Sequence, residues 1–222
     1  YFAREAKKVV VDIDLNELGK KRGFTPDITV HSDAKRFIEL LIKAGAPTLG
    51  AIDEWIKRAQ AWKKMYPAVL PMHKTQKTLS SYLCADAISG AAKAGQTVII
   101  DEGGNLVWSM QSWQVKKDQR IISTFGNSPM GYALPAAIGA SIAKPGEEII
   151  CIDGDGGFQM NIQELQTVAH YKLPIKIFLL NNRSMGIIKQ FQDLAFGSRR
   201  YAVEPSGGYS APDFVAVAKA YK

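Results

Sequence analysis

The chain has 222 residues, of which 46% are hydrophobic and 22% are charged, a balance that is ordinary for a globular protein with a sizeable core. No apolar stretch approaches the roughly 18–20 residues that a membrane span requires, and the apolar run near the N-terminus is too short and too acidic at its end to read as a signal peptide. The net charge of +7 comes mostly from residues 1–77, where no aromatic recognition motif accompanies the basic clusters, so a solvated basic surface is favoured and nucleic-acid binding is not.

Two strands and two helices are predicted in the N-terminal part of the chain. A β-rich run at 9–14 leads into a short helical turn, and a second strand is expected at 28–30. Ser32 or Asp33 is placed to start a helix that ends at Gly45. Four such elements are too few to form a stable domain alone, so we expect the remnant of a larger α/β domain.

A helix between prolines separates this part from the rest. The stretch IDEWIKRAQAWKKMY at 52–66 is helical in pattern, and Pro47, Pro67 and Pro71 mark the connectors around it. The last predicted helix is followed by no strand, so the C-terminus reads as cut. The predicted parts are residues 1–45 (domain remnant), 46–72 (linker helix and connectors) and 73–222 (main domain).

Helices and strands alternate throughout the main domain. Its strand-like runs are rich in β-branched residues and apolar on both faces, which is typical of parallel strands covered by helices. The predicted fold class is therefore α/β, a parallel β-sheet with helices on both faces, preceded by a partial α/β domain. The predicted strands are 97–101, 120–124, 147–153 and 175–182, and the predicted helices are 78–95, 130–146, 161–173 and 213–222.

The third and fourth of these strands end in polar residues. Asp155 lies in Gly-Asp-Gly-Gly after one strand, and Asn182 lies in Asn-Asn after the next. In a right-handed crossover of about 30 residues both strands point the same way, so both side chains come to the carboxyl edge where ligands bind. Carboxylate and amide oxygens suit Mg²⁺, and Gly154, Gly156 and Gly157 let backbone N–H groups approach anionic oxygens. The pattern predicts a magnesium-bridged diphosphate.

Two other interpretations of the same residues stay open at this point. Gly-Asp-Gly is common in tight turns, and Asn181-Asn182 could form one as well. A dinucleotide fingerprint is disfavoured because Gln159 replaces its third glycine and no acid closes the next strand. Within the crossover, we predict that Asn161 caps the helix, with Glu164 at its third position.

The two cysteines indicate a compartment. Cys84 and Cys151 lie in apolar segments and lack the spacing of a metal site. We therefore read them as buried free thiols in a reducing environment, which makes the cytoplasm the expected location.

Several segments together resemble a known family. Gly-Asp-Gly followed by Asn-Asn resembles the thiamine diphosphate motif, and STFGNSPMGYALPAAIGA at 123–140 is similar to a segment of the acetolactate synthase group. VVVDIDLNELGK at 9–20 resembles the last strand of that group's middle domain, and WIKRAQAWKKMYP at 55–67 its linker helix. The resemblance covers nearly the whole chain. It implies that residues 73–222 form a thiamine diphosphate/magnesium-binding domain that is truncated at its C-terminus.

The resemblance also implies a cofactor site, position by position. Asp155, the Asn182 side chain and the Ser184 backbone carbonyl would hold Mg²⁺. Met130, which from spacing alone would be a core residue, would wedge between the cofactor's rings and enforce its bent conformation. The carbonyl of Ser128, where the family usually has glycine, would accept from the aminopyrimidine. The other residues implied to contact the cofactor are Gly103, Gly104, Asn105, Gly154, Gly156, Gly157, Met185 and Gly186.

Departures from the family pattern leave the substrate open. Ile187 and Ile188 would line the substrate pocket, and Phe191 stands where many acetolactate synthases carry a tryptophan. DEGGN at 101–105 is more similar to the oxalyl- and hydroxyacyl-CoA lyase branch than to the Gly-Gln-His of many acetolactate synthases. The implied reaction is decarboxylation of pyruvate and condensation with a second 2-keto acid. The alternatives are a same-cofactor decarboxylase, an acyl-CoA lyase, or a non-catalytic cofactor-binding fragment.

The resemblance finally concerns partners and groups outside these residues. The glutamate that activates the aminopyrimidine in the family belongs to another domain on the neighbouring subunit, so we expect a homodimer or homotetramer and no activity from this chain alone. Glu102 and Glu164 do not replace that glutamate. Arg199 and Arg200 lie in a predicted mobile loop at 196–214 and read as solvated. Small 2-keto acids are the expected substrates, and no nucleic-acid or membrane partner is expected. Whether the full-length protein binds FAD is undecided.

Overall fold

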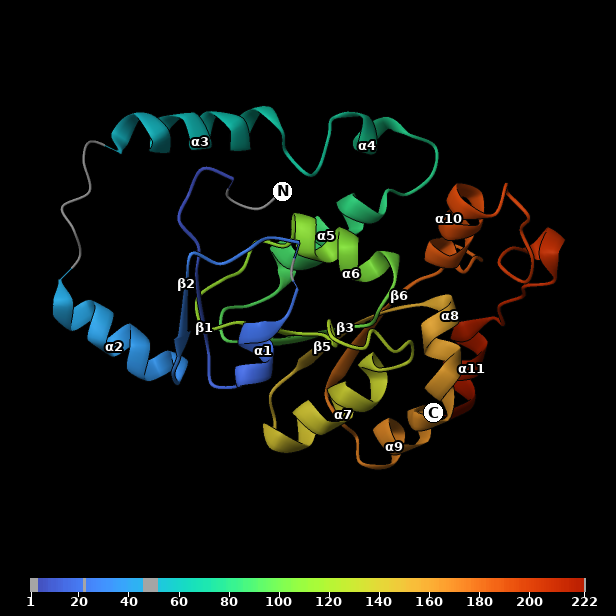
Figure 1. The fold of residues 1–222 in the computed structure, drawn as a ribbon. Helices are drawn as coiled ribbons and strands as arrows, with labels where there is room; N and C mark the ends of the chain where they lie inside the picture. Colours follow the sequence, from blue (N-terminus) through green and yellow to red (C-terminus); the bar gives the residue numbers. More distant parts are fainter. Residues whose placement is uncertain (1–3, 22, 46–51, 222) are drawn as a thin grey trace. The chain divides into compact units, whose positions relative to one another are not determined.

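A computed structural model describes residues 4–21, 23–45 and 52–221 (Figure 1). The chain divides into two compact units, Tyr1–Tyr66 and Pro67–Lys222. Across the described ranges, no helix combines the length and apolarity needed to cross a bilayer.

The first unit contains the predicted pair of short strands, which are parallel to each other. The Asp33 side chain accepts a hydrogen bond from the backbone N–H of Arg36, and Gly45 ends the helix with a φ of 83°, so both predicted helix boundaries are confirmed. The predicted helix at 52–66 is also present, whereas Pro47 lies outside the described residues. The elements are β1 (Val9–Asp12), α1 (Leu15–Gly19), β2 (Ile28–His31), α2 (Ala34–Ala44) and α3 (Asp53–Met65).

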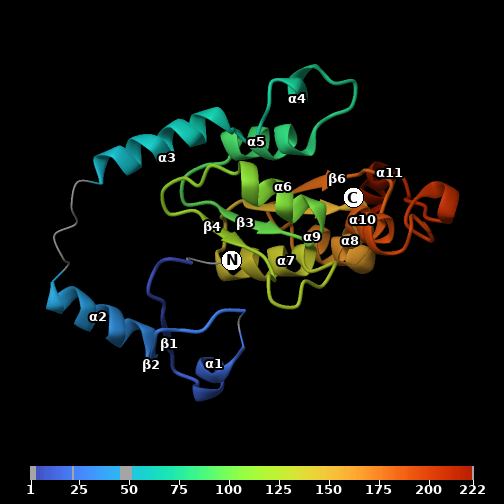
Figure 2. The same cartoon turned by 45° about the horizontal axis from the view of Figure 1, so that its top comes forward.

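The second unit is built on a four-stranded sheet in the order β4-β3-β5-β6, and every neighbouring pair is parallel. Figure 2 shows the sheet from a second direction. In chain order the elements are α4 (Met72–Thr75), α5 (Ser81–Ala91), β3 (Thr97–Ile100), α6 (Gly104–Ser112), β4 (Arg120–Ile122), α7 (Ala133–Ala143), β5 (Ile149–Gly154), α8 (Asp155–Phe158), η1 (Gln159–Glu164), α9 (Leu165–His170), β6 (Ile175–Leu180), α10 (Gly186–Ala195), η2 (Pro205–Gly207) and α11 (Phe214–Tyr221).

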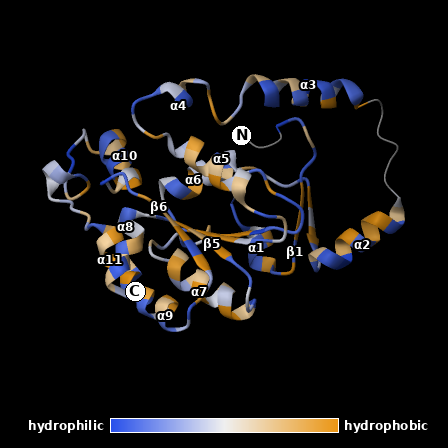
Figure 3. Ribbon diagram, turned by 180° about the vertical axis from the view of Figure 1, so that it is seen from behind, coloured by the Kyte–Doolittle hydropathy of each residue, from blue (hydrophilic) through white to orange (hydrophobic). Residues whose placement is uncertain are grey.

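The sheet of the second unit is buried on both faces. Val98, Ile100 and Ile152 pack with Leu106 of α6 on one face, while Ile99 and Cys151 pack with α7 on the other. The strands of this sheet are coloured largely as hydrophobic in Figure 3. Successive residues of a strand point to opposite faces of the sheet, so a sheet that is buried on both faces requires strands that are apolar at every position. The predicted α/β class with a helix-covered parallel sheet is confirmed.

One local prediction is wrong, and one helix was not predicted. Asn161 does not cap a helix, because the chain turns helical at once after β5, and Asn161 (φ −134°, ψ 29°) instead interrupts that helical stretch. Its side-chain amide donates to the carbonyl of Gly131 at 2.7 Å. Residues 104–112, where no helix or strand is predicted, form α6. The segment 196–214, predicted to be a mobile loop, forms hydrogen bonds and ion pairs with neighbouring residues.

Both cysteines are free, as predicted. Cys151 is fully buried in β5, whereas Cys84 in α5 is partly exposed. Burial raises the pKa of both thiols.

Candidate active site

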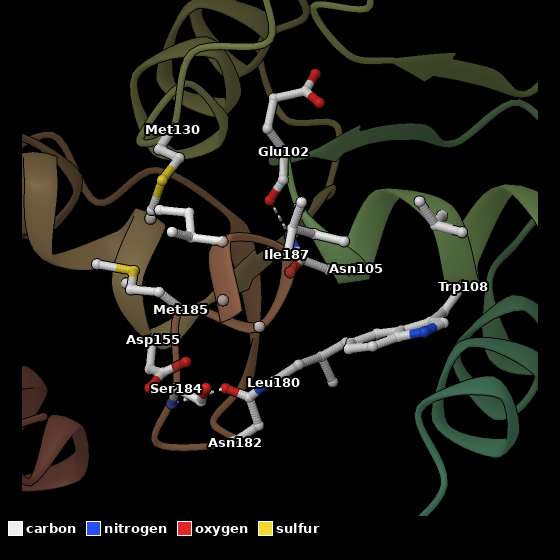
Figure 4. A pocket seen from close by; sticks show the side chains of 18 of the residues that line it. Glu102, Asn105, Trp108, Met130, Asp155, Leu180, Asn182, Ser184, Met185 and Ile187 are labelled. Carbon is white, nitrogen blue, oxygen red and sulfur yellow. Dashed lines mark hydrogen bonds between the residues drawn. The ribbon is translucent and has the colours of Figure 1, made fainter. Parts of the chain in front are cut away.

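A cavity of about 370 Å³ opens at the carboxyl edge of β3, β5 and β6 (Figure 4). Most of the sequence-predicted residues meet there, although they come from four separate loops. Ser128 and Phe191 do not line the cavity, and the Phe191 side chain is 62% exposed on α10. The predicted residues that line it are Gly103, Gly104, Asn105, Met130, Gly154, Asp155, Gly156, Gly157, Asn182, Ser184, Met185, Gly186, Ile187 and Ile188.

Asp155 is the buried acid of this cavity. It follows β5 directly and opens α8, and its residue surface is only 2% exposed. One carboxylate oxygen, Oδ2, accepts a hydrogen bond of 2.8 Å from the hydroxyl of Tyr209. A carboxylate this deeply buried needs hydrogen bonds or a counter-ion to stay charged.

Asn182 and Ser184 reach the cavity from the end of β6. Gly154 pairs with Leu180 in the parallel register, so the chain leaves both strands side by side. The Asn182 Oδ1 accepts from the backbone N–H of Ser184 at 3.0 Å. The Ser184 hydroxyl donates to the carbonyl of Val203 at 2.8 Å. In Figure 4, Asp155, Asn182 and Ser184 lie close together.

The turn interpretation of Asn181-Asn182 is correct for the backbone and does not exclude a site. The Asn181 Oδ1 accepts from the backbone N–H of Arg183 at 3.0 Å, in the same way as Asn182 accepts from Ser184. Both asparagines therefore form Asx turns. Only Asn182 also lines the cavity.

The glycines of the loop after β5 are required by close packing. A Cβ atom on Gly157 would lie 2.1 Å from the Asp101 Oδ2 and 2.6 Å from the Asp153 Oδ1. One on Gly156 would lie 2.5 Å from the Met185 sulfur. Any side chain at these positions would move groups that shape the cavity, so close packing requires glycine at both.

A pair of buried carboxyl groups, Asp101 and Asp153, supports the loops from below. Asp101 accepts from the backbone N–H groups of Gly131 and Ala133 at 3.1 and 3.0 Å, and Asp153 accepts from that of Gly154 at 2.7 Å. Burial, followed by the charge of Asp101, raises the pKa of Asp153 to about 9. Asp153 is therefore protonated near neutral pH, and the pair anchors both the Met130 turn and the Gly154 loop.

Met130 and Ser128 lie on one turn after β4. Met130 lines the cavity, and its terminal carbon would lie 3.3 Å from a Cβ on Gly156. Ser128 is exposed and has a φ of 48°, a left-handed conformation that favours glycine. This conformation explains physically why glycine suits the position.

Asn105 takes a different role from a direct phosphate donor. Its side-chain amide donates to the carbonyls of Asp101 and Glu102 at 3.0 and 3.1 Å, and it is only 5% exposed. Both amide hydrogens are therefore used to shape the loop that begins α6. The backbone N–H groups at that helix start remain the donors available to an anion.

The charge of the cavity decides what it can hold. Among the described residues that line it there is no Lys, Arg or His, and the ionisable acids are Glu102 and Asp155. Glu102 accepts from the hydroxyls of Ser123 and Thr124. In the ranges described, no group of three His, Cys, Asp or Glu side chains could bind a metal. A diphosphate would fit here only with a divalent cation, bound by one carboxylate together with amide and carbonyl oxygens.

Sequence reasoning missed several residues of the cavity. Trp108 lies on α6 with its ring against Gly104, where a Cβ would come within 2.4 Å of it, and recognising the helix would have placed it there. Tyr82, which stacks on His73, and Gln190 also line the cavity. Tyr209 contacts Asp155 from 54 positions away, and nothing in the local pattern indicates this.

Comparisons with known proteins agree with the geometry. Residues 101–222 match the family model described as thiamine pyrophosphate enzyme, C-terminal TPP binding domain. The chain is 38% identical to the acetolactate synthase large subunit of Cyanidium caldarium over 99% of this chain and 37% of that protein. It is 30% identical to the acetolactate synthase isozyme 3 large subunit of Escherichia coli strain K12, over 96% of this chain and 37% of that protein.

The chain thus spans about 37% of the length of these relatives. The family model covers more than half of the chain and includes the loops after β3, β5 and β6 that form the cavity. The chain belongs to the thiamine pyrophosphate enzymes and carries their C-terminal TPP-binding domain.

Proposed function

We propose that the cavity binds thiamine diphosphate through Mg²⁺ and that the whole protein is an acetolactate synthase-like enzyme, which decarboxylates pyruvate and joins the product to a second 2-keto acid. The observation that carries the proposal is a cavity with oxygen ligands and glycine backbone but without a cationic side chain among its described lining residues. The relatives named acetolactate synthase support the reaction class. The two free cysteines fit a reducing compartment such as the cytoplasm.

In this proposal the chain's own residues bind and orient the cofactor. Asp155, the Asn182 amide oxygen and the Ser184 carbonyl hold the metal ion, whose charge offsets that of the diphosphate. Backbone N–H groups of the loops that begin at Gly103 and Gly154 donate to the diphosphate oxygens.

The two methionines of the cavity shape the ring end of the site. Met130 and Met185 both lie close to Gly156, where a side chain would displace them, and they would offer an apolar surface to the rings of a bound cofactor. When bound, thiamine diphosphate supplies the nucleophilic carbon and the electron sink for decarboxylation, which no amino-acid side chain provides. The protein's part is orientation and electrostatics.

Metal-dependent cofactor binding tests the first part of the proposal. Titration of thiamine diphosphate into the protein by calorimetry should give heat in the presence of Mg²⁺ and little in EDTA. Asp155→Ala should abolish the Mg²⁺-dependent heat, since the buried carboxylate is the only charged ligand of the proposed set. Equal heats with Mg²⁺ and with EDTA would refute the metal-bridged site.

A same-cofactor decarboxylase or acyl-CoA lyase is the second candidate. Two observations favour it: the Asp101–Asn105 loop, which resembles the lyase branch, and Phe191, which lies outside the cavity lining. Product analysis of the whole protein with pyruvate separates the candidates. Acetolactate supports condensation, and acetaldehyde alone supports decarboxylation.

We also propose a homodimer or homotetramer for the whole protein. The described cavity contains no carboxylate free to activate the cofactor, because Asp155 is assigned to the metal and Glu102 is bound to two hydroxyl groups. A residue from elsewhere must supply that function, and a closed symmetric assembly is the common way to bring one. Light scattering that shows a monomer with full activity would contradict this assembly.

A further inference from the structure

The segment between α10 and α11 is fastened at both ends of the proposed metal site. We call residues 199–209 the clasp. Its Val203 is 2% exposed, and the Val203 carbonyl accepts from the Met185 N–H at 2.9 Å and from the Ser184 hydroxyl at 2.8 Å. Its Tyr209 is 9% exposed and donates to Asp155. Two of the three proposed metal ligands are therefore held by one segment.

Ion pairs attach the clasp to α10. Arg200 forms a forked pair with Asp193 at 2.9 and 3.1 Å and lies 3.5 Å from Glu204. Glu204 in turn pairs with Lys189. Arg200 is exposed, as predicted, and its ion pair with Asp193 joins it to α10. These contacts fix the segment in place and with it the ring of Tyr209.

The hydrogen bonds around Tyr209 have a defined direction. The Gln159 side-chain amide donates to the Asp155 carbonyl at 3.1 Å and to the Tyr209 hydroxyl at 3.4 Å. Because the hydroxyl accepts from Gln159, its single proton is directed to the Asp155 Oδ2.

This arrangement leaves Asp155 with one carboxylate oxygen for a metal. An octahedral ion such as Mg²⁺ takes a single oxygen from each carboxylate and keeps strict geometry, whereas Ca²⁺ accepts both oxygens of a carboxylate. Partners that hydrogen-bond to a ligating carboxylate fix its orientation, and their loss typically weakens metal binding about 10–100-fold.

We propose that Tyr209 is a positioning residue that holds Asp155 as a one-oxygen ligand and so makes the cofactor site selective for Mg²⁺ over Ca²⁺. The proposal rests on the proposed function, since it concerns the same metal site. The clasp would then serve to hold the Tyr209 hydroxyl against Asp155.

The test compares Tyr209→Phe with a matched control. Tyr201→Phe removes the same atom from the same segment, but the Tyr201 side chain is 81% exposed and only its backbone bonds to Gln192. Binding of Mn²⁺ in saturating thiamine diphosphate is followed by electron paramagnetic resonance, and Mg²⁺ and Ca²⁺ affinities are obtained by competition. Thermal melting without metal checks that each variant folds.

We expect Tyr209→Phe to weaken Mg²⁺ binding about 10-fold or more and Ca²⁺ binding less, so that the ratio of the two affinities falls. Tyr201→Phe should match the parent. A Mg²⁺ affinity unchanged within about twofold, or equal losses for both ions, would overturn the proposal, because a purely structural role would not alter selectivity.

A second variant and the unsubstituted protein separate failure of the Tyr209 proposal from failure of the proposed function. If Tyr209→Phe does not fold, Gln159→Leu removes the donor that orients the hydroxyl and should lower the Mg²⁺/Ca²⁺ ratio in the same direction; an unchanged ratio would overturn the proposal. If the parent itself shows no cofactor-dependent Mn²⁺ binding, the proposed function fails. If the parent binds and Tyr209→Phe behaves identically, only the role of Tyr209 fails.

Discussion

The two strand ends that meet at the cavity are held in opposite ways. After β5, Asp155, Gly156 and Gly157 are buried, and the packing of the core fixes their positions. After β6, Asn181 and Asn182 are exposed, and local Asx turns together with the clasp hold the loop. One side of the proposed metal site is thus part of the core and the other is a surface structure. Substitutions that add volume on the first side should affect folding, whereas removal of a ligand side chain on either side should affect binding.

Gly157→Ala should give the largest effect on the buried side. The new Cβ would lie 2.1 and 2.6 Å from two fully buried carboxyl oxygens, which cannot withdraw into solvent, so we expect a loss of about 3 kcal/mol or more in the free energy of unfolding. Gly139→Ala in α7, where nothing lies within 4 Å, is the control and should gain about 0.5–1 kcal/mol. Equal denaturation midpoints for the two variants would contradict the packing argument.

Asp153→Asn tests the buried carboxyl pair through pH. The folded pKa of Asp153, about 9, lies above its unfolded value, so its contribution to stability is present at low pH and is lost as pH rises through that value. Without metal, the unsubstituted protein should lose about 4 kcal/mol more than Asp153→Asn between pH 5 and pH 8, since asparagine mimics the neutral acid. Parallel stability curves from urea denaturation at each pH would argue against a protonated Asp153.

The two asparagines after β6 offer a matched pair on the exposed side. Each side chain accepts one backbone N–H at 3.0 Å, but only Asn182 lines the cavity. Asn182→Ala should weaken Mg²⁺-dependent cofactor binding by about 10-fold, which corresponds to about 1.4 kcal/mol, and Asn181→Ala should leave it nearly unchanged. Calorimetry that gives the same affinity for both variants would remove Asn182 from the ligand set.

Ser128→Gly should have the smallest effect. Glycine removes the strain of the left-handed backbone at a φ of 48° in the folded state, but it adds conformational entropy to the unfolded chain. The free energy of unfolding should therefore rise by only up to about 1 kcal/mol. Thermal melting with an exposed control, Ser206→Gly, would measure it. A lower melting temperature for Ser128→Gly would show that the serine side chain contributes more than its backbone strain costs.

The sequence predicts those features that depend on the regular geometry of a parallel sheet. Apolar runs that do not alternate with polar residues predicted the four strands. The right-handed crossover rule predicted that Asp155 and Asn182 lie at one edge of the sheet. The helix α6 was missed because its N-cap, Gly103, and its first residue, Gly104, are glycines and no side chain caps it. Asn161 was misassigned because the tertiary hydrogen bond to Gly131 outcompeted its local capping preference.

Contacts between distant segments were beyond sequence reasoning. Tyr209 reaches Asp155 only because the clasp folds back along α10 through ion pairs, and no local pattern encodes that path. The role of Asn105 was also hidden, since its amide could equally have faced a ligand. Its use on two backbone carbonyls follows from the tight loop after β3.

Anomalous diffraction from crystals soaked with Mn²⁺ and thiamine diphosphate would test the metal-bridged site most directly. We predict a single strong peak between the Asp155 carboxylate and the Asn182 amide oxygen, with the diphosphate beside the loops that begin at Gly103 and Gly154. A bound cofactor whose metal lies away from both side chains, or a cavity that stays empty at saturating concentrations, would contradict it.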